Sequence, residues 1–138
     1  MANHNDLAKN FVEGTYPAEH VGAMRYEKDK AFSYDVLIAR KAKGVLLINN
    51  MPYSTSTAAH RGKIRNAAKD VGMPIIEVPN LYFEHEVNLQ HFSGVRRELE
   101  HRKTRARLVK PIQDSLDHLD KTEQLYRGLF MLDAKEAA

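Results

Sequence analysis

The stretch at residues 45–72, VLLINNMPYSTSTAAHRGKIRNAAKDVG, constrains the fold more than any other part of the chain. Its first four residues are aliphatic, a pattern typical of a buried strand, and the Asn-Asn-Met-Pro sequence that follows ends that strand because proline lacks a ladder donor. Ser56 or Thr57 is then expected to cap a helix that stops at Gly72. Such a connection aims free backbone N–H groups and the positive end of the helix dipole at one place, which favours anions.

The residues on either side of this stretch predict the rest of a small sheet. Short apolar segments predict strands at residues 24–26 and 31–39, and the second of these alternates apolar and polar side chains. Residues 73–78, MPIIEV, have the length and the β-branched content of a fourth strand. With a short N-terminal helix ahead of them and residues 15–20 as a loop, these elements predict an α+β fold whose small antiparallel sheet has the order βββαβ.

Beyond residue 80 the apolar positions approach the three- and four-residue spacing of a helix. Pro111 interrupts this pattern, so we expect either a helical hairpin or one long kinked helix over residues 81–138. The chain therefore divides into an α+β core domain at residues 1–80 and a C-terminal helical region. The apolar stripe is longer than a four-stranded sheet can cover, so the helices either pack on their own sheet or join copies of the chain into a homo-oligomer.

Composition narrows the class of protein. Hydrophobic residues make up 43% and charged residues 28% of the chain, which is ordinary for a folded domain. The chain has no cysteine, which excludes a disulfide framework and a thiolate metal site. The N-terminus lacks the apolar core of a signal peptide, and no apolar run reaches the length of a membrane span. We therefore expect a cytoplasmic protein without a membrane partner.

The first half of the chain carries three short motifs: F-x-x-G at the end of the predicted N-terminal helix, S-Y-x-x-x-I-A in a predicted strand and Y-S-x-S-T-x-x-H in the turn. Their residues are Phe11, Gly14, Ser33, Tyr34, Ile38, Ala39, Tyr53, Ser54, Ser56, Thr57 and His60. Together they resemble small uncharacterised proteins of bacteriophages and mobile elements, which more usually read S-Y-G-x-x-I-A and Y-S-V-T-T-S-K-H-Q. This chain departs from that pattern at Asp35, Thr55, Ser56 and Arg61. The resemblance implies a phage-encoded protein in the host-cell cytoplasm, and it implies no particular chemistry.

The turn and the start of the helix supply the first group of candidate ligand-binding residues. Side chains that suit phosphate are found at Tyr53, Ser54, Ser56, Thr57, His60, Arg61 and Arg65. The alternative is a capped helix whose hydroxyls satisfy its own amides, with His60 on the buried face beside Ile64. No third group that could orient a Ser–His pair is evident, so we expect no catalytic residue. His85 and His91 lack the spacing of a metal-binding pair, so we expect neither a metal nor a cofactor.

Basic side chains form the second group of candidates. Arg61, Arg65 and Lys69 are four residues apart and are predicted to face outward along one side of the helix. Residues 96–110 are locally basic, with seven cations and two acids. The candidates for nucleic-acid contact are Lys69, Arg96, Arg97, Arg102, Lys103 and Arg107. A solvated helix face is the alternative explanation of the same charges.

These features favour a non-enzymatic binding protein that recognises a polyanion, with nucleic acid as the expected partner. The alternative is an anti-defence or host-interaction protein. Such a protein would use the turn as a discrete pocket that sequesters a small phosphorylated nucleotide, or it would dock to a host protein.

Overall fold

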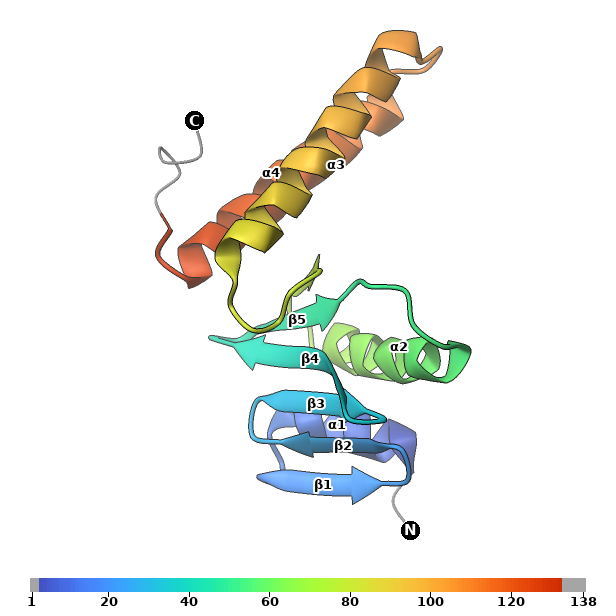
Figure 1. Cartoon of the computed structure of the whole chain (residues 1–138), viewed down its shortest axis with the longest axis vertical. Helices are drawn as coiled ribbons and strands as arrows, with labels where there is room; N and C mark the ends of the chain where they lie inside the picture. Colours follow the sequence, from blue (N-terminus) through green and yellow to red (C-terminus); the bar gives the residue numbers. More distant parts are fainter. Residues whose placement is uncertain (1–2, 133–138) are drawn as a thin grey trace. The chain divides into compact units, whose positions relative to one another are not determined.

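The computed structural model describes residues 3–132 and divides into two compact units, with the boundary between Phe83 and Glu84 (Figure 1). The first unit holds the sheet and two helices, and the second holds the other two helices. The boundary expected from the sequence is residue 80, which lies in the segment that joins the last strand to the first helix of the second unit.

The first unit is built on a six-stranded mixed sheet in which every strand lies next to its neighbours in sequence. The strands are β1 (Ala18–Val21), β2 (Met24–Glu27), β3 (Lys30–Ser33), β4 (Val36–Ala42), β5 (Val45–Asn49) and β6 (Ile75–Val78). The first five strands pair antiparallel, whereas β6 pairs parallel with β5. A parallel pair requires a crossover connection, and helix α2 (Thr55–Asp70) provides it.

The α+β class is confirmed, but the predicted sheet of four antiparallel strands is wrong in two respects. The sheet has six strands, and its last strand, β6, is parallel to its neighbour. The predicted loop at residues 15–20 contains part of β1, and the predicted strand at residues 31–39 is divided between β3 and β4. Tyr34 and Asp35 form a tight turn between these strands, with φ of 49° and 66°. The alternation of apolar and polar residues runs through this turn, so periodicity alone does not reveal it.

The strand predicted at residues 45–48 is confirmed, because β5 is buried at all five of its positions. The helix that follows begins at Thr55 with Ser54 as its cap, so the predicted cap at Ser56 or Thr57 is wrong by two or three residues. Gly72, with φ of 71°, follows the end of the helix as predicted.

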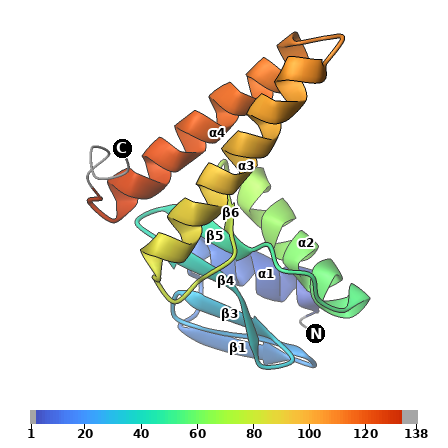
Figure 2. The same ribbon diagram turned by 45° about the horizontal axis from the view of Figure 1, so that its top comes forward.

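Helix α1 (His4–Glu13) and helix α2 lie on the same face of the sheet (Figures 1 and 2). The apolar residues of the core between these helices and the sheet are Leu7, Ala8, Phe11, Val12, Met24, Tyr26, Ala31, Ile38, Ala39, Leu46, Ile48, Ile64 and Ala68. Because Ile64 and Ala68 anchor α2 in this core, the first turns of that helix lie against the end of β3, where Ser33 is buried.

The second unit is a hairpin of two helices, α3 (His85–Arg105) and α4 (Lys110–Leu129), joined by residues 106–109 (Figure 2). Of the two predicted arrangements, a hairpin or one kinked helix, the hairpin is correct. Proline at the start of α4 is tolerated because the first turn of a helix lacks acceptors for its N–H groups. Among residues 3–132, no helix combines the length and the apolar character needed to cross a bilayer.

Buried polar groups hold the two helices of the hairpin in register. The Tyr126 hydroxyl lies 2.7 Å from His85 Nδ1 and accepts a hydrogen bond from Asn88 Nδ2 at 2.8 Å. Arg96 of α3 donates to Glu123 of α4 at 2.6 Å. A pairing of the helices that left one of the buried groups without a partner would cost about 1–3 kcal/mol.

Candidate functional site

Four polar side chains meet where α2 begins and β3 ends. The Ser54 hydroxyl caps the helix by accepting a hydrogen bond from the Thr57 backbone N–H at 3.3 Å, and it donates to the Thr57 hydroxyl at 3.2 Å. Ser33 Oγ lies 3.2 Å from the Thr57 hydroxyl and 2.6 Å from His60 Nδ1. We call Ser33, Ser54, Thr57 and His60 the polar cluster. Its hydroxyls satisfy one another and the amide of the helix start.

Three of the four residues of the polar cluster are buried, whereas Ser54 is exposed. His60 is 6% exposed, Thr57 is 4% exposed and Ser33 is fully buried. The Tyr34 ring stacks on the His60 ring with centroids 5.9 Å apart, and the His4 ring meets it edge-on at 4.8 Å. Burial, together with the nearby His4 and Lys63, lowers the pKa of His60. His60 is therefore a neutral, hydrogen-bonded core histidine, which is the second of the two interpretations that the sequence left open.

The polar cluster joins two motifs that are separate in the sequence. Ser33 and Tyr34 come from the S-Y-x-x-x-I-A motif, whereas Thr57 and His60 come from the turn motif. Residues from two motifs that are distant in the sequence thus contact one another in the fold. Sequence reasoning did not include Ser33 and Tyr34 among the candidate site residues. The S-Y-x-x-x-I-A motif that they share was the sequence signal that could have identified them.

In the predicted basic stripe of α2, Arg61 and Arg65 are half-buried and are engaged by acceptors within the chain. Arg61 Nη1 donates to the Met51 carbonyl at 2.9 Å and also to the carbonyl of Asn49, so its guanidinium closes the loop between β5 and α2. Arg65 donates to Glu77 of β6 at 2.8 Å. Lys69 is exposed as predicted. The acceptors lie across the loop and on the next strand, which spacing along the helix does not show.

The remaining candidates of the turn lie outside the polar cluster. Ser56 is exposed in the first turn of α2, and Tyr53 is 40% exposed, with its ring 5.6 Å from the Arg61 guanidinium carbon. Arg61 Nε is a buried side-chain nitrogen that has no hydrogen-bond partner among the described residues. The turn is therefore organised chiefly by contacts within the chain.

A second concentration of polar groups lies at the end of the helical hairpin where α3 and α4 are joined. We call residues 101–111 the hairpin tip; they contain five cations and no acidic residue. The cations are Arg102, Lys103, Arg105, Arg107 and Lys110. Lys103 donates to Gln113 at 2.6 Å, and Lys110 is paired with Asp114 at 3.3 Å. The three arginines are exposed, and their side chains make no hydrogen bond or ion pair with any other described residue.

The start of α4 adds to the positive character of the hairpin tip. Val109 stands at the cap position and makes no side-chain capping bond, and the first turn of α4 holds no acidic residue. The partial positive charge of the helix start is therefore not neutralised by a carboxylate. The cations of the last turn of α3 also complement the negative end of their own helix, which accounts for part of their placement.

Two further candidates on α3 differ in their surroundings. Arg96 is engaged by Glu123 at 2.6 Å and by Asp120 at 2.9 Å, and these hydrogen bonds raise its pKa. Arg97 is exposed and makes no ion pair with a described residue. Arg96 is thus part of the helix pairing, while Arg97 is an exposed cation of α3 outside the hairpin tip.

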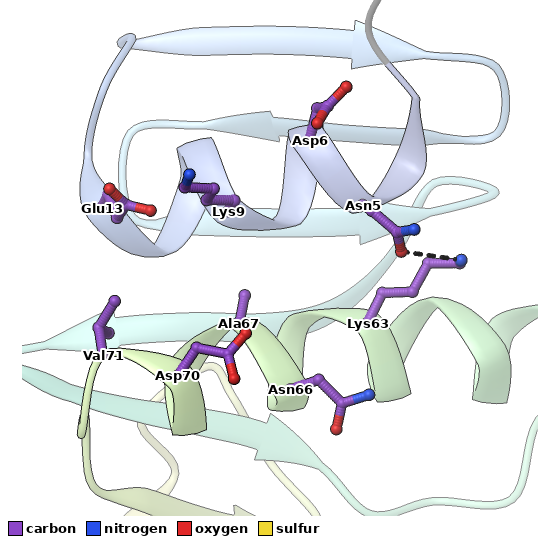
Figure 3. Close-up of a pocket in the computed structure, with 9 residues that line it drawn as sticks. All are labelled: Asn5, Asp6, Lys9, Glu13, Lys63, Asn66, Ala67, Asp70 and Val71. Atoms are coloured by element: carbon purple, nitrogen blue, oxygen red, sulfur yellow. Dashed lines mark hydrogen bonds between the residues drawn. The ribbon is translucent and has the colours of Figure 1, made fainter.

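The first unit has a polar groove between α1 and α2 with a volume of about 490 Å³ (Figure 3). Its lining residues are Asn5, Asp6, Lys9, Glu13, Lys63, Asn66, Ala67, Asp70 and Val71. Lys63 Nζ donates to Asn5 Oδ1 at 3.0 Å across the groove. Cations and carboxylates alternate along its walls, so the groove does not select for one sign of charge. The sequence analysis did not predict it, because the helices come together only in the fold.

Within residues 3–132, no three His, Asp or Glu side chains gather as ligands for a metal ion. No protein-family model, curated protein or solved structure matches this chain.

Proposed function

We propose that this protein is a non-enzymatic nucleic-acid-binding protein that contacts the phosphate backbone through the hairpin tip. The observation that carries the proposal is the group of three exposed arginines, Arg102, Arg105 and Arg107, in a segment without any acidic residue. Guanidinium groups donate paired hydrogen bonds that match phosphate oxygens, and they hold their water less tightly than ammonium groups. Neutralising phosphates releases counterions, and this release supplies the free energy of binding.

The hairpin tip supports this function better than the start of α2 does. Arg61 and Arg65, which the sequence analysis assigned to phosphate, are engaged by loop carbonyls and by Glu77. Thr57 and His60 are buried and hydrogen-bonded within the polar cluster. A nucleotide pocket at this place would require these internal bonds to be replaced. The side chains of the hairpin-tip arginines need to break no ion pair with another residue of the range 3–132 before they bind.

Fluorescence anisotropy with a labelled DNA duplex, measured across a series of salt concentrations, tests the proposal. The double variant Arg105→Gln/Arg107→Gln should bind more weakly at low salt. The slope of log K against log salt should fall in magnitude by about 2, because each lost phosphate contact removes about 0.9 from it. Both side chains are exposed, so the fold should be unaffected.

The matched control is Lys9→Gln/Lys121→Gln, which removes the same number of charges from exposed positions outside the hairpin tip. It should leave the salt slope within the error of the wild type. The proposal is refuted if the wild type does not bind at low salt, or if the control weakens binding as much as the tip variant does.

A further inference from the structure

The hairpin tip presents an aliphatic residue at its apex as well as its cations. Leu108 is 72% exposed and the adjacent Val109 is 42% exposed, although both could be buried at a favourable free energy in a protein core. They lie in the connection between α3, which ends at Arg105, and α4, which begins at Lys110. Cations therefore stand on both sides of an exposed leucine in the sequence of the loop.

The composition of the hairpin tip indicates which class of partner the exposed Leu108 contacts. Residues 101–111 contain no Phe, Tyr or Trp, so they lack the large aromatic rings on which unpaired bases usually stack. They also lack the tryptophan and tyrosine residues that typically hold a loop at a membrane surface, and three of the five cations are arginine. An aliphatic side chain among phosphate-binding arginines is the arrangement that proteins use to wedge open a step between stacked base pairs.

We propose that the hairpin tip recognises duplex nucleic acid whose stacking is locally weakened, such as a mismatch or a nick, by inserting Leu108 between adjacent base pairs. This inference rests on the proposed function, since the flanking arginines must first bind the phosphates. Opening a base step costs free energy, and the cost is smaller where a mismatch or a nick has already weakened the stack. Leu108 thereby converts a contact without sequence preference into selection for deformable sites.

The test compares three duplexes of the same length, one fully paired, one with a central mismatch and one with a central nick, by competition anisotropy. The wild type should prefer the interrupted duplexes by about tenfold, the factor that corresponds to about 1.4 kcal/mol of saved unstacking free energy. Leu108→Ala should lose this preference while keeping its affinity for the paired duplex within about twofold. Leu125→Ala, which truncates a 38% exposed leucine within α4, is the matched control and should keep the preference.

A second readout reports the insertion itself. A 2-aminopurine base beside the mismatch should brighten when the wild type or Leu125→Ala binds, because its emission rises on unstacking, and it should not brighten with Leu108→Ala. Equal affinity for all three duplexes, or a preference that survives in Leu108→Ala, overturns the inference and leaves phosphate binding intact. Arg105→Gln/Arg107→Gln should weaken binding to all three duplexes alike.

Vesicles of phosphatidylserine and phosphatidylcholine serve as the competing target. Binding to these vesicles that depends on Leu108, with no binding to any duplex at low salt, assigns the hairpin tip to lipid and overturns both the proposed function and the inference. Binding to duplexes with the expected preference, and no dependence of vesicle binding on Leu108, supports both.

Discussion

At the residue scale, the His60 ring makes a hydrogen bond through one nitrogen and packs against two other rings. Ser33 Oγ lies 2.6 Å from Nδ1, Tyr34 stacks on the ring, and His4 meets its edge. These contacts come from β3, from the turn after it and from α1, which are distant from His60 in the sequence. A histidine with this set of neighbours fixes the position of α2 on the sheet.

We expect His60→Ala to lower the free energy of unfolding by about 2 kcal/mol, through the cavity and through the buried Ser33 hydroxyl that loses a partner. Urea unfolding followed by circular dichroism measures this change. Ser56→Ala, at an exposed position in the first turn of the same helix, is the control and should shift the free energy by less than about 0.5 kcal/mol. An unchanged midpoint for His60→Ala would show that the polar cluster does not support the fold.

At the element scale, the turn between β3 and β4 carries a conformational cost. Tyr34 and Asp35 both have positive φ, at 49° and 66°, a region that residues with a Cβ atom rarely occupy. The carboxylate lies 3.4 Å from Arg25 Nε, but its side chain is 88% exposed, so this ion pair contributes little.

We therefore expect Asp35→Gly to stabilise the protein by about 0.5–1 kcal/mol, because glycine adopts the left-handed conformation without strain. Asp35→Ala should destabilise it, since alanine keeps the strain and lacks the polar group that helps aspartate tolerate this conformation. Both variants remove the same ion pair, so stability changes of opposite sign isolate the effect of the backbone conformation. Thermal unfolding curves measure both, and a shift of equal sign in the two variants would contradict the expectation.

At the scale of the whole molecule, neutral histidines are distributed over both units. Burial lowers the pKa of His60 in the first unit and of His85 and His91 in the second. As the pH falls, each of these histidines is protonated at a higher pH in the unfolded chain, where its pKa is near 6.5, than in the folded chain. The stability that these groups contribute is thus fully present above pH 6.5 and is lost as the pH falls from 6.5 toward the lower folded pKa.

We expect the free energy of unfolding to decrease between about pH 7.5 and about pH 5.5, a window in which most carboxylates stay ionised in both states. Denaturant titrations at several pH values measure the slope. His60→Gln, which keeps a polar side chain of similar size, should make the slope shallower. A flat slope in the wild type would show that the histidines bind protons equally in the folded and unfolded chains, and an unchanged slope in His60→Gln would show the same for His60 alone.

Much of the fold follows from local patterns in the sequence. The aliphatic run at residues 45–48 has a single favourable environment, a buried strand, and it is one. The helical spacing around Pro111 predicted either two helices or one kinked helix, because proline is compatible with the first turn of a helix and disrupts its interior; the structure has two helices. The turn at Tyr34 and Asp35 could not be predicted in this way, since neither residue is the glycine or asparagine that typically marks such a turn.

The candidate sites were predictable to a smaller extent, because a side chain's partners lie elsewhere in the chain. The basic character of residues 96–110 was evident from the sequence alone. Arg96 is engaged by Glu123, whereas Arg102, Arg105 and Arg107 make no ion pair with a described residue, and this difference depends on how the two helices face each other. The same holds for Arg61, whose acceptors are loop carbonyls.

The sequence by itself determined the α+β class, the buried strand β5, the helix that follows it and the basic charge of the segment around the hairpin tip. These properties depend on hydrophobic periodicity, on turn chemistry and on composition, which act over a few neighbouring residues. Only the tertiary structure decided that Ser33 contacts His60, that Arg61 closes a loop and that Leu108 stands exposed among exposed arginines. Pairings between distant residues are set by how the elements pack, because each polar side chain takes the partner that the packed fold brings within hydrogen-bond distance.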